Sequence, residues 1–412
     1  MYCNQPLKGI KVVDLTGYGA GPIAGKILGD WGADVIKVES LAGDPSRPSG
    51  IALGLRADEE QNPHFEQKDA NKRGITLDLK TPEGQEIMDK LLKEANIFIS
   101  NFRLKALVKL GLDYETVSKK FPHLIWGHLC GFGHEGPAAD NPGFDTVSYY
   151  ARSGMMIDFC EGGTEGGAYP LTPPFGLGDT VVGLQFASGV AISLYQQAKT
   201  GKGEKVVVSL YGSAMYSEAW VMQEVYHGGK YPKTRFYPDS PMRNTFRCKD
   251  GTWFMLSVIV YDRYYPVICK IIGREDLITD ERFNNEKKIR SDKKLSNEFL
   301  KILDAAFATK DWPEWDKILR ENDLAHDRIN HMIDALNDEQ AKANNNMYFY
   351  KNRDGSDDLA ITTPIRFGGY YTYPHKTCPL LGEHSTEILE SLGYTDEQIA
   401  GFISKGVVTQ HK

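Results

Sequence analysis

The chain has 412 residues, of which 41% are hydrophobic and 25% are charged, so it is long enough for more than one domain with a large buried core. Its formal net charge of −7 argues against a nucleic-acid-binding protein. No block of lysines and arginines suggests binding to an anionic membrane surface.

Cysteine usage and hydropathy indicate the compartment. The six cysteines lie far apart and form no C-x-x-C pair, which is typical of a reducing environment. The first ten residues lack the apolar core of a signal peptide, and no run of 18 apolar residues indicates a membrane span. We therefore expect a cytoplasmic protein with no membrane or nucleic-acid partner.

The first segment of regular structure is a βαβ unit. Residues 10–15 form a short apolar run that predicts a buried strand, and residues 16–22 are a Gly-rich turn. Pro22 suits the first turn of a helix that we expect to continue to Trp31. Gly32 ends this helix, and residues 33–39 form the next predicted strand.

The same alternation continues along the chain. Further strands are predicted at residues 74–79, 96–101, 124–129 and 205–210. A helix is predicted over 81–94, and a long one begins near Asp179 and ends at the turn at 199–203. Strands that alternate with helices predict an α/β fold, with a mostly parallel, doubly wound, Rossmann-like sheet.

A change in composition after residue 226 predicts a second domain. Tyr, Pro and Arg crowd residues 231–247, residues 248–253 resemble a hairpin turn, and residues 259–323 have a charged helical pattern. We therefore expect a smaller α+β domain at 226–325. The large domain would comprise 1–210 and 340–412, with linkers at 211–225 and 326–339.

Several common active-site motifs are missing. The turn at 17–22 does not match G-x-G-x-x-G, because Pro22 lacks the N–H that would face a phosphate; a plain strand-to-helix turn is the alternative to a dinucleotide site. The sequence has no H-E-x-x-H or other short metal spacing, no G-x-S-x-G elbow and no P-loop. We expect no metal.

Carboxylates in special loops are the remaining candidates. Asp179 follows a Gly-rich turn at the start of an apolar helix. It can cap that helix, or it can act as a nucleophile surrounded by backbone donors. Asp145 precedes an aromatic segment and can be a cap or turn residue. The basic residues Lys72 and Arg73, like others in this half of the chain, are each expected to be solvated charges.

Taken together, several short segments resemble the class III (CaiB/BaiF-type) CoA-transferase family across nearly the whole chain. The matching segments occur in the order and spacing of the family. They are residues 7–15, 20–22, 32–39, 43–45, 71–73, 110–114, 131–133 with 136–137, 142–145, 178–179 and 381–384.

This resemblance implies a role for particular residues. Asp179 matches the family's nucleophile, Gly178 would leave room for an oxyanion, and Asp145 matches an acidic position close to the nucleophile. The implied contacts to coenzyme A are Tyr18, Leu77, Lys80, Asn101, Phe102, Arg103 and Lys109. The resemblance also implies an interlocked homodimer.

The implied activity is the transfer of CoA from an acyl-CoA thioester to a free carboxylic acid through an aspartyl-CoA intermediate, without a metal. Residues 142–145, 149–152, 209–210 and 213–216 resemble the subgroup that acts on 2-hydroxyisocaproate or aryllactates in amino-acid fermentation. The alternatives are an α-methylacyl-CoA racemase-like enzyme, a CoA-thioester hydrolase and a non-catalytic acyl-CoA-binding protein.

The sequence departs from related sequences in three places, and the first two bear on the activity and the substrate. Phe144 stands where racemases carry a histidine, and a phenyl ring cannot act as a base. The run of glycines found in formyl and oxalyl transferases is missing near 243–246. Ser40 stands where some members have a basic residue, so one contact to a CoA phosphate is missing from this position.

Overall fold

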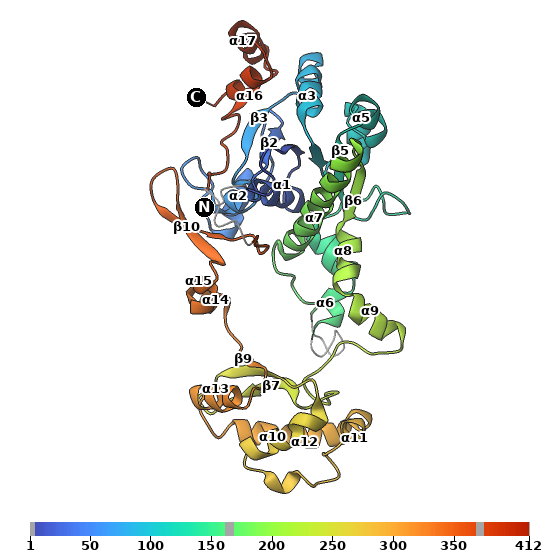
Figure 1. The fold of residues 1–412 in the computed structure, drawn as a ribbon, viewed down its shortest axis with the longest axis vertical. Helices are drawn as coiled ribbons and strands as arrows, with labels where there is room; N and C mark the ends of the chain where they lie inside the picture. The colour runs from blue at the N-terminus through green and yellow to red at the C-terminus, as the bar shows by residue number, and fades with distance from the viewer. Residues whose placement is uncertain (1–4, 161–168, 368–374, 412) are drawn as a thin grey trace. The chain divides into compact units, whose positions relative to one another are not determined.

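The computed structural model describes residues 5–160, 169–367 and 375–411 (Figure 1). The chain forms two compact units. The large unit comprises Met1–Met156, Thr172–His227 and Ala343–Lys412, and the small unit comprises Ile157–Leu171 and Gly228–Lys342.

The centre of the large unit is a six-stranded sheet whose neighbouring strands are all parallel. Its strands are β1 (Lys11–Leu15), β2 (Asp34–Glu39), β3 (Arg73–Thr76), β4 (Ile97–Ser100), β5 (Ile125–Cys130) and β6 (Lys205–Ser209). The strand order is β3-β2-β1-β4-β5-β6, so the winding direction reverses between β1 and β4. The predicted parallel sheet is confirmed, with strand ends that differ by at most three residues.

Helices cover both faces of this sheet. Successive residues of each strand point to opposite faces, so apolar strand residues need cover on both sides. Val13 belongs to an apolar cluster on one face and Val12 to a cluster on the other. The helices of this unit include α1 (Ala20–Asp30), η1 (Arg47–Leu53), α2 (Pro63–Asp69), α3 (Pro82–Glu94), α4 (Leu104–Leu110), α5 (Tyr114–Lys120), the π-helical η2 (Asp145–Ala151), α7 (Leu177–Thr200), α8 (Leu210–Ser217), α9 (Ala219–Tyr226), α16 (Ser385–Ser391) and α17 (Asp396–Ser404). The hairpin of β10 (Met347–Lys351) and β11 (Asp357–Ile361) completes it.

Helix α7 is long and apolar enough to cross a membrane by length and composition alone, with a mean hydropathy of 1.4 over an 18-residue window. Of that window, 39% is buried within the chain. Val182, Phe186 and Val190 are fully buried in the cluster that also contains residues of β4 and β5. A helix that packs on a sheet in this way passes the same test, so α7 argues only weakly for a membrane span.

The small unit pairs a short antiparallel sheet with helices. Its sheet has the order β7 (Arg243–Arg247), β8 (Trp253–Ser257) and β9 (His326–Arg328). Its helices are α10 (Tyr261–Ile271), η3 (Glu275–Leu277), α11 (Glu286–Ser291), α12 (Lys293–Phe307), α13 (Trp312–Glu321) and α14 (Met332–Asn337). Two short helices, α6 (Met155–Asp158) and α15 (Glu339–Ala343), cross the division between the units. An aromatic core that includes Phe254, Phe299 and Trp315 holds this unit together.

Both segments that the sequence predicted to be linkers are structured. Residues 211–225 lie mostly in α8 and α9, where the Ser209 hydroxyl accepts a hydrogen bond from the N–H of Gly212 and so caps α8. Residues 326–328 pair with β8, which satisfies backbone groups that a linker would expose. The small unit accordingly extends to Lys342.

A buried cluster of charges lies beneath the first crossover of the large unit. Lys72 pairs with Asp14 at 2.8 Å and with Asp69 at 2.7 Å. Lys37 pairs with Asp44 at 3.1 Å and with Asp69 at 3.2 Å. Burial opposes the charge on Lys37, but these carboxylates outweigh it and raise its pKa, while the two lysines hold the pKa of Asp69 at about 2 against the effect of burial. The expectation that Lys72 is a solvated charge is wrong.

The two lysines also fix the turn that follows β1. The Nζ of Lys37 donates to the carbonyl of Thr16 at 3.1 Å, and the Nζ of Lys72 donates to the carbonyl of Pro22 at 2.8 Å. Asp44 accepts a hydrogen bond from the N–H of Tyr18 at 3.3 Å. The charge cluster therefore holds both ends of the Gly-rich turn.

Replacing Lys72 with methionine tests this cluster. The change leaves Asp14 without its ion pair in a buried site, and removing one partner of a buried pair typically costs about 3–5 kcal/mol. We expect equilibrium urea unfolding to show a loss of that size. Lys93→Met, at an exposed position of α3, should change the free energy of unfolding by less than about 0.5 kcal/mol. Equal values for the two variants would contradict the prediction.

Candidate active site

A cavity of about 610 Å³ opens where the strand order reverses. Parallel α/β sheets bind ligands in the crevice outside the carboxyl ends of their strands, at this kind of reversal. The cavity wall includes residues that directly follow β1, β2, β4 and β5, and Asp179 from α7. All of these residues belong to the large unit.

The turn after β1 is shaped by Asn101, which follows β4. The N–H of Gly17 donates to Oδ1 of Asn101 at 3.0 Å, and Nδ2 of Asn101 donates to the carbonyl of Gly17 at 2.7 Å. Tyr18 has a positive φ of 69°, and its ring meets the ring of Phe144 edge to face, with centroids 5.3 Å apart. Both rings line the cavity.

Asp179 is not the cap of its helix. Helix α7 begins at Leu177, and Gly176 with φ 71° occupies the capping position. Asp179 therefore lies in the first turn of α7, with its side chain in the cavity wall. The capping role that the local sequence left open is thereby excluded.

The Asp179 carboxylate lies directly against Gly19. A Cβ atom built on Gly19 would be 2.0 Å from Oδ2 of Asp179 and 2.6 Å from its Cγ, so only glycine leaves space for the carboxylate at this point. Gly19 precedes α1, and the backbone N–H of Ala20 stabilises the charged form of the carboxylate. Free N–H groups at a helix N-terminus favour negative charge, so this position can hold an oxyanion.

Burial and, to a smaller extent, the nearby negative charge of Asp145 raise the pKa of Asp179 to about 7. The charge of Lys68 and the N–H of Ala20 act in the opposite direction. A carboxyl group with such a pKa exchanges its proton near neutral pH, which is typical of functional sites.

Asp145 and Gly178 support the site in a way that the sequence did not predict. A Cβ on Gly178 would be 2.9 Å from Cγ of Tyr149 and 3.1 Å from Cβ of Asp145, so the missing side chain allows η2 to pack against α7. Burial raises the pKa of Asp145, while the N–H groups of Thr146, Gly176 and Asp179 lower it. Only the contact with Thr146, at 2.7 Å, has hydrogen-bond geometry, and Oδ2 of Asp145 has no partner among the described residues.

Lys68 is a functional candidate that sequence reasoning missed. It lies on α2, is 5% exposed, and makes no hydrogen bond or ion pair within the part of the chain that the structure describes. Burial lowers its pKa, and the charges of Asp69, Asp44 and Asp179 oppose that effect. It therefore provides a cation near Asp179 that is not neutralised by a contact of its own.

The structure brings together some of the predicted CoA contacts and not others. Tyr18, Asn101, Phe102 and Arg103 line the cavity with Asp179. Arg103 is exposed and makes no ion pair among the described residues, so its guanidinium is available to an anionic ligand.

The other predicted contacts lie elsewhere. Leu77 is 2% exposed within an apolar cluster, which leaves only its backbone for a ligand. Lys80 is exposed in the turn before α3, and Lys109 is exposed on α4. None of the three is among the residues that line the cavity.

A second group of reactive side chains lines the same cavity. The ligand atoms of His128, Cys130 and His134 lie within 4.8 Å of one another. This group was not predicted from the sequence, because its spacing, H-x-C-x3-H, matches none of the common metal-binding motifs. Strand periodicity, which places His128 and Cys130 on one face of β5, is the signal that could have found it.

The chain as a whole matches a known protein family and several named proteins. The family described as CoA-transferase family III matches residues 7–385. The chain is 38% identical to (R)-2-hydroxy-4-methylpentanoate CoA-transferase of Clostridioides difficile, over 98% of this chain and 99% of that protein. It is 36% identical to cinnamoyl-CoA:phenyllactate CoA-transferase of Clostridium sporogenes, over 95% of this chain and 94% of that protein.

A solved structure, that of Rv3272 from Mycobacterium tuberculosis, superposes with a TM-score of 0.80 at 27% sequence identity, covering 94% of this chain and 99% of that one. The match extends through both units. With the family match across nearly the full length, these similarities confirm the resemblance seen in the sequence. The chain belongs to CoA-transferase family III and is a CoA-transferase.

Proposed function

We propose that the protein transfers CoA between an acyl-CoA thioester and a free 2-hydroxy acid, with Asp179 as the covalent nucleophile. The observation that carries this proposal is the position of the Asp179 carboxylate. It lies in the cavity wall against Gly19, where the N–H of Ala20 at the start of α1 stabilises its charge. A carboxylate in a cavity wall with a backbone N–H that favours its charge suits acyl transfer.

The chemistry proceeds by exchange of carboxylate and thiolate. The ionised Asp179 attacks the thioester carbonyl of the donor, which forms a mixed anhydride and releases the CoA thiolate. The thiolate attacks the aspartyl carbonyl, which forms an aspartyl-CoA thioester and frees the donor acid. The acceptor carboxylate then reverses these two steps. Each step breaks one acyl bond and forms another, so neither ATP nor an oxidant is consumed.

Roles for the neighbouring groups follow from their positions. The N–H of Ala20 would stabilise the oxyanion that forms at the aspartyl carbonyl. Lys68 favours the ionised, nucleophilic form of Asp179, and Asp145 opposes it. Tyr18, Asn101, Phe102 and Arg103 would contact CoA, with Arg103 binding a phosphate. Leu77, Lys80 and Lys109 remain predictions for the outer part of the CoA molecule.

The proposed acceptor is a 2-hydroxy acid with an apolar side chain, such as 2-hydroxyisocaproate or an aryllactate. The two relatives described above, at 38% and 36% identity, carry names of this substrate class. The apolar side chains of Leu104, Leu129, Phe144 and Leu210 in the cavity wall suit such a group. Fermentation of amino acids in the cytoplasm is the corresponding proposed role.

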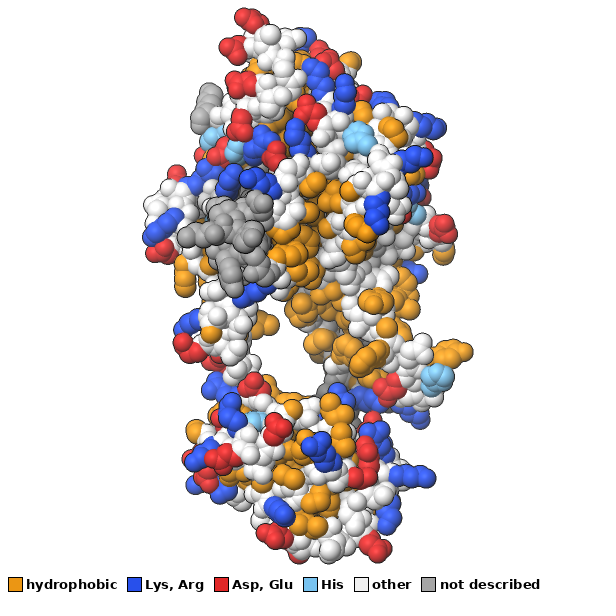
Figure 2. Space-filling view, viewed as in Figure 1, with side chains coloured by type: hydrophobic (Ala, Val, Ile, Leu, Met, Phe, Trp, Pro, Cys, Tyr) orange, Lys and Arg blue, Asp and Glu red, His pale blue; other side chains and the backbone are white. Residues whose placement is uncertain are grey.

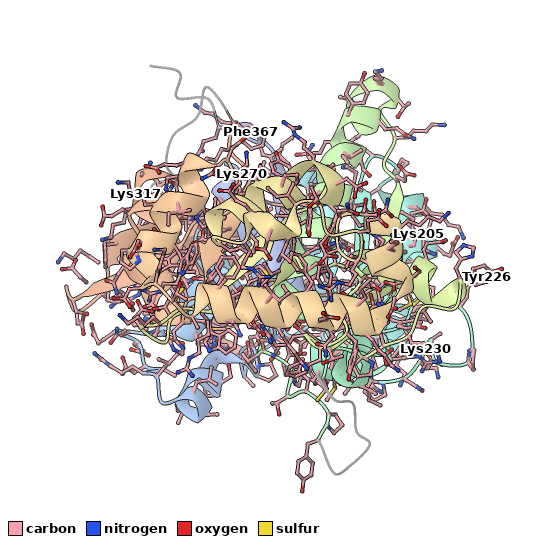
Figure 3. The ribbon with its side chains drawn as sticks, turned by 90° about the horizontal axis from the view of Figure 1, so that it is seen from below. Lys205, Tyr226, Lys230, Lys270, Lys317 and Phe367 are labelled. Atoms are coloured by element: carbon pink, nitrogen blue, oxygen red, sulfur yellow. The ribbon has the colours of Figure 1, made fainter. Side chains whose placement is uncertain are left out.

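We also propose that the protein is a homodimer. Apolar side chains gather over α7, α8 and α9 (Figure 2). Ile192, Tyr195, Tyr216 and Trp220 are between 67% and 92% exposed, and Tyr226 lies at the end of α9 with 83% exposure (Figure 3). A patch of this kind marks a protein interface. The mass of the protein in solution, measured by sedimentation, tests whether it is a dimer.

Trapping the intermediate tests the proposed nucleophile. After incubation with cinnamoyl-CoA, hydroxylamine should convert Asp179 to a hydroxamate that peptide mass spectrometry locates. Asp179→Asn should give no adduct and lower the rate of CoA exchange by about 1,000-fold or more, because the amide is no nucleophile. Asp396→Asn, at an exposed position of α17, is the matched control and should react normally.

The same incubation separates the alternative activities. A transferase passes CoA to phenyllactate or another acceptor acid as a new thioester and releases little free CoA with or without the acceptor, whereas a hydrolase releases free CoA without an acceptor. An adduct at another residue, or exchange that persists in Asp179→Asn, would contradict the assignment of Asp179. CoA binding without any adduct would favour the non-catalytic alternative.

Gly19→Ala tests the contact between Gly19 and the nucleophile. The added methyl group cannot coexist with Oδ2 of Asp179 at 2.0 Å, so the carboxylate must move. Displacing a reacting group by about 1 Å costs on the order of 100-fold in rate, and we expect that loss in kcat with little change in thermal stability. Gly401→Ala, where no atom lies within 4 Å of the new methyl group, should retain full activity. Normal kcat in Gly19→Ala would show that the carboxylate need not lie there.

The raised pKa of Asp179 predicts a pH profile. The ionised carboxylate is the reactive form, so kcat/KM should fall as the pH drops through about 7 and should level off above it. Asp145→Asn removes a negative charge that raises this pKa, and should move the acidic limb to lower pH. The measurement is kcat/KM between about pH 5 and 9 for the wild type, Asp145→Asn and Asp396→Asn. If the acidic limb of the kcat/KM profile does not move in Asp145→Asn, the charge of Asp145 does not raise the pKa of Asp179.

A further inference from the structure

The side chains of His128, Cys130 and His134 form a compact group of potential ligands in the cavity wall. Nδ1 of His128 lies 2.7 Å from Nε2 of His134, and all three ligand atoms lie within 4.8 Å of one another. His128 and Cys130 are two residues apart on β5, so their side chains project from the same face of the strand. His134 comes from the loop that follows, after Gly133 with φ 99°.

The hydrogen bonds of His128 fix its tautomer. Its Nε2 lies 2.8 Å from the carbonyl of Phe102, and because a carbonyl only accepts, Nε2 carries the proton. The neutral ring therefore presents the lone pair of Nδ1 toward His134. A second nitrogen that donates to a backbone carbonyl is the arrangement that orients metal-binding histidines in proteins.

Both imidazoles are held in their neutral form. Burial lowers the pKa of His128 to about 4, and burial together with the charge of Lys205 lowers the pKa of His134. His128 is 2% exposed and stacks on Trp126, with ring centroids 5.3 Å apart and an interplanar angle of 24°. The Nδ1 lone pair accepts a hydrogen bond from His134, and the stacking on Trp126 fixes the direction of the ring.

The thiol of Cys130 completes the group. Its Sγ lies 3.7 Å from the carbonyl of Val208, and the side chain is only partly buried. Burial raises the pKa of the thiol, while the N–H groups of Gly133 and Phe132 act in the opposite direction. These two N–H groups would also stabilise a thiolate bound to a cation.

We propose that His128, Cys130 and His134 bind a thiophilic divalent cation of the Zn²⁺ class through Nδ1, Sγ and Nε2. One thiolate with two imidazoles suits zinc and cobalt, and does not suit magnesium or calcium, which prefer oxygen ligands. Ligand atoms around tetrahedral zinc lie roughly 3.3–3.8 Å apart. The nitrogen pair at 2.7 Å must therefore open slightly, and separations that extend up to 4.8 Å must shorten, which the loop position of His134 allows.

Binding releases protons in a defined way. The Cys130 thiol loses its proton to solvent, and Sγ forms a bond to the metal. His134 now donates from Nε2 to His128, so its proton must move to Nδ1 before Nε2 can bind. One thiolate balances one of the two positive charges. Lys205, on β6 (labelled in Figure 3), lowers the pKa of both imidazoles, and its positive charge repels the remaining charge of the cation.

Three protein ligands leave a fourth position on a tetrahedral metal. The three side chains line the same cavity as Asp179, so this position faces the space that the proposed function assigns to substrates. Free CoA is itself a thiol and can occupy it. The bound cation would therefore act as an inhibitor that retains CoA in the cavity, and the metal site itself exists whether or not Asp179 is the nucleophile.

Titration with Co²⁺ tests the site directly. The metal-free wild type should bind one Co²⁺ per chain, with a thiolate-to-cobalt charge-transfer band in the near ultraviolet. Cys130→Ser should abolish that band, and His134→Asn should weaken binding by about 10–100-fold. Cys248→Ser, a buried cysteine of the small unit, and Asp179→Asn should bind like the wild type.

A second measurement uses only the wild type, so it does not depend on the folding of a variant. One equivalent of Zn²⁺ should protect Cys130 from alkylation by iodoacetamide, as located by peptide mass spectrometry, and leave the modification of Cys160 unchanged. The proposal is overturned if the wild type shows no thiolate band, if a folded Cys130→Ser variant keeps it, or if Zn²⁺ fails to protect Cys130.

Discussion

The charge cluster under the first crossover is the constraint on which the active site depends. Lys37 and Lys72 are fully buried, and each holds carboxylates and a backbone carbonyl of the Gly-rich turn at once. The position of this turn sets where α1 begins, and α1 provides the donor that faces Asp179. A hydrophobic core could stabilise the unit equally well, but it could not fix a turn of polar peptide groups in one position.

The pattern of the sequence predicted the architecture because its signal is local. Short apolar runs that alternate with helices predict an α/β fold with a parallel sheet, and the structure has such a sheet. The predicted linkers failed for a local reason as well. The segment at 326–328 is too short for a visible strand pattern, and it becomes a strand only because the edge of β8 is available to it.

The active site, too, could be predicted from the sequence only in part. Asp179 could be found from the ordered motifs around it, whereas the reasons for its reactivity lie in contacts between distant parts of the chain. Gly19 leaves the space, Lys68 provides the charge and η2 packs behind it, and no local pattern brings these segments together. The buried state of Lys72 was missed likewise, because its partner Asp14 lies 58 residues away.

Asn101 shows how the sheet opens a cavity without loss of hydrogen bonding. β1 and β4 end here, and the chain turns away from the sheet in opposite directions. The N–H and carbonyl of Gly17 would therefore be buried with no strand beside them to pair with. The side-chain amide of Asn101 has the shape of a peptide group and takes the place of the missing strand residue. The amide thus continues the hydrogen bonding of the sheet by one residue. Leaving the N–H and carbonyl of Gly17 without partners would cost on the order of several kcal/mol. A shorter hydroxyl or a carboxylate at this position could satisfy only one of the two groups, so the requirement for an amide comes from the sheet as much as from the substrate.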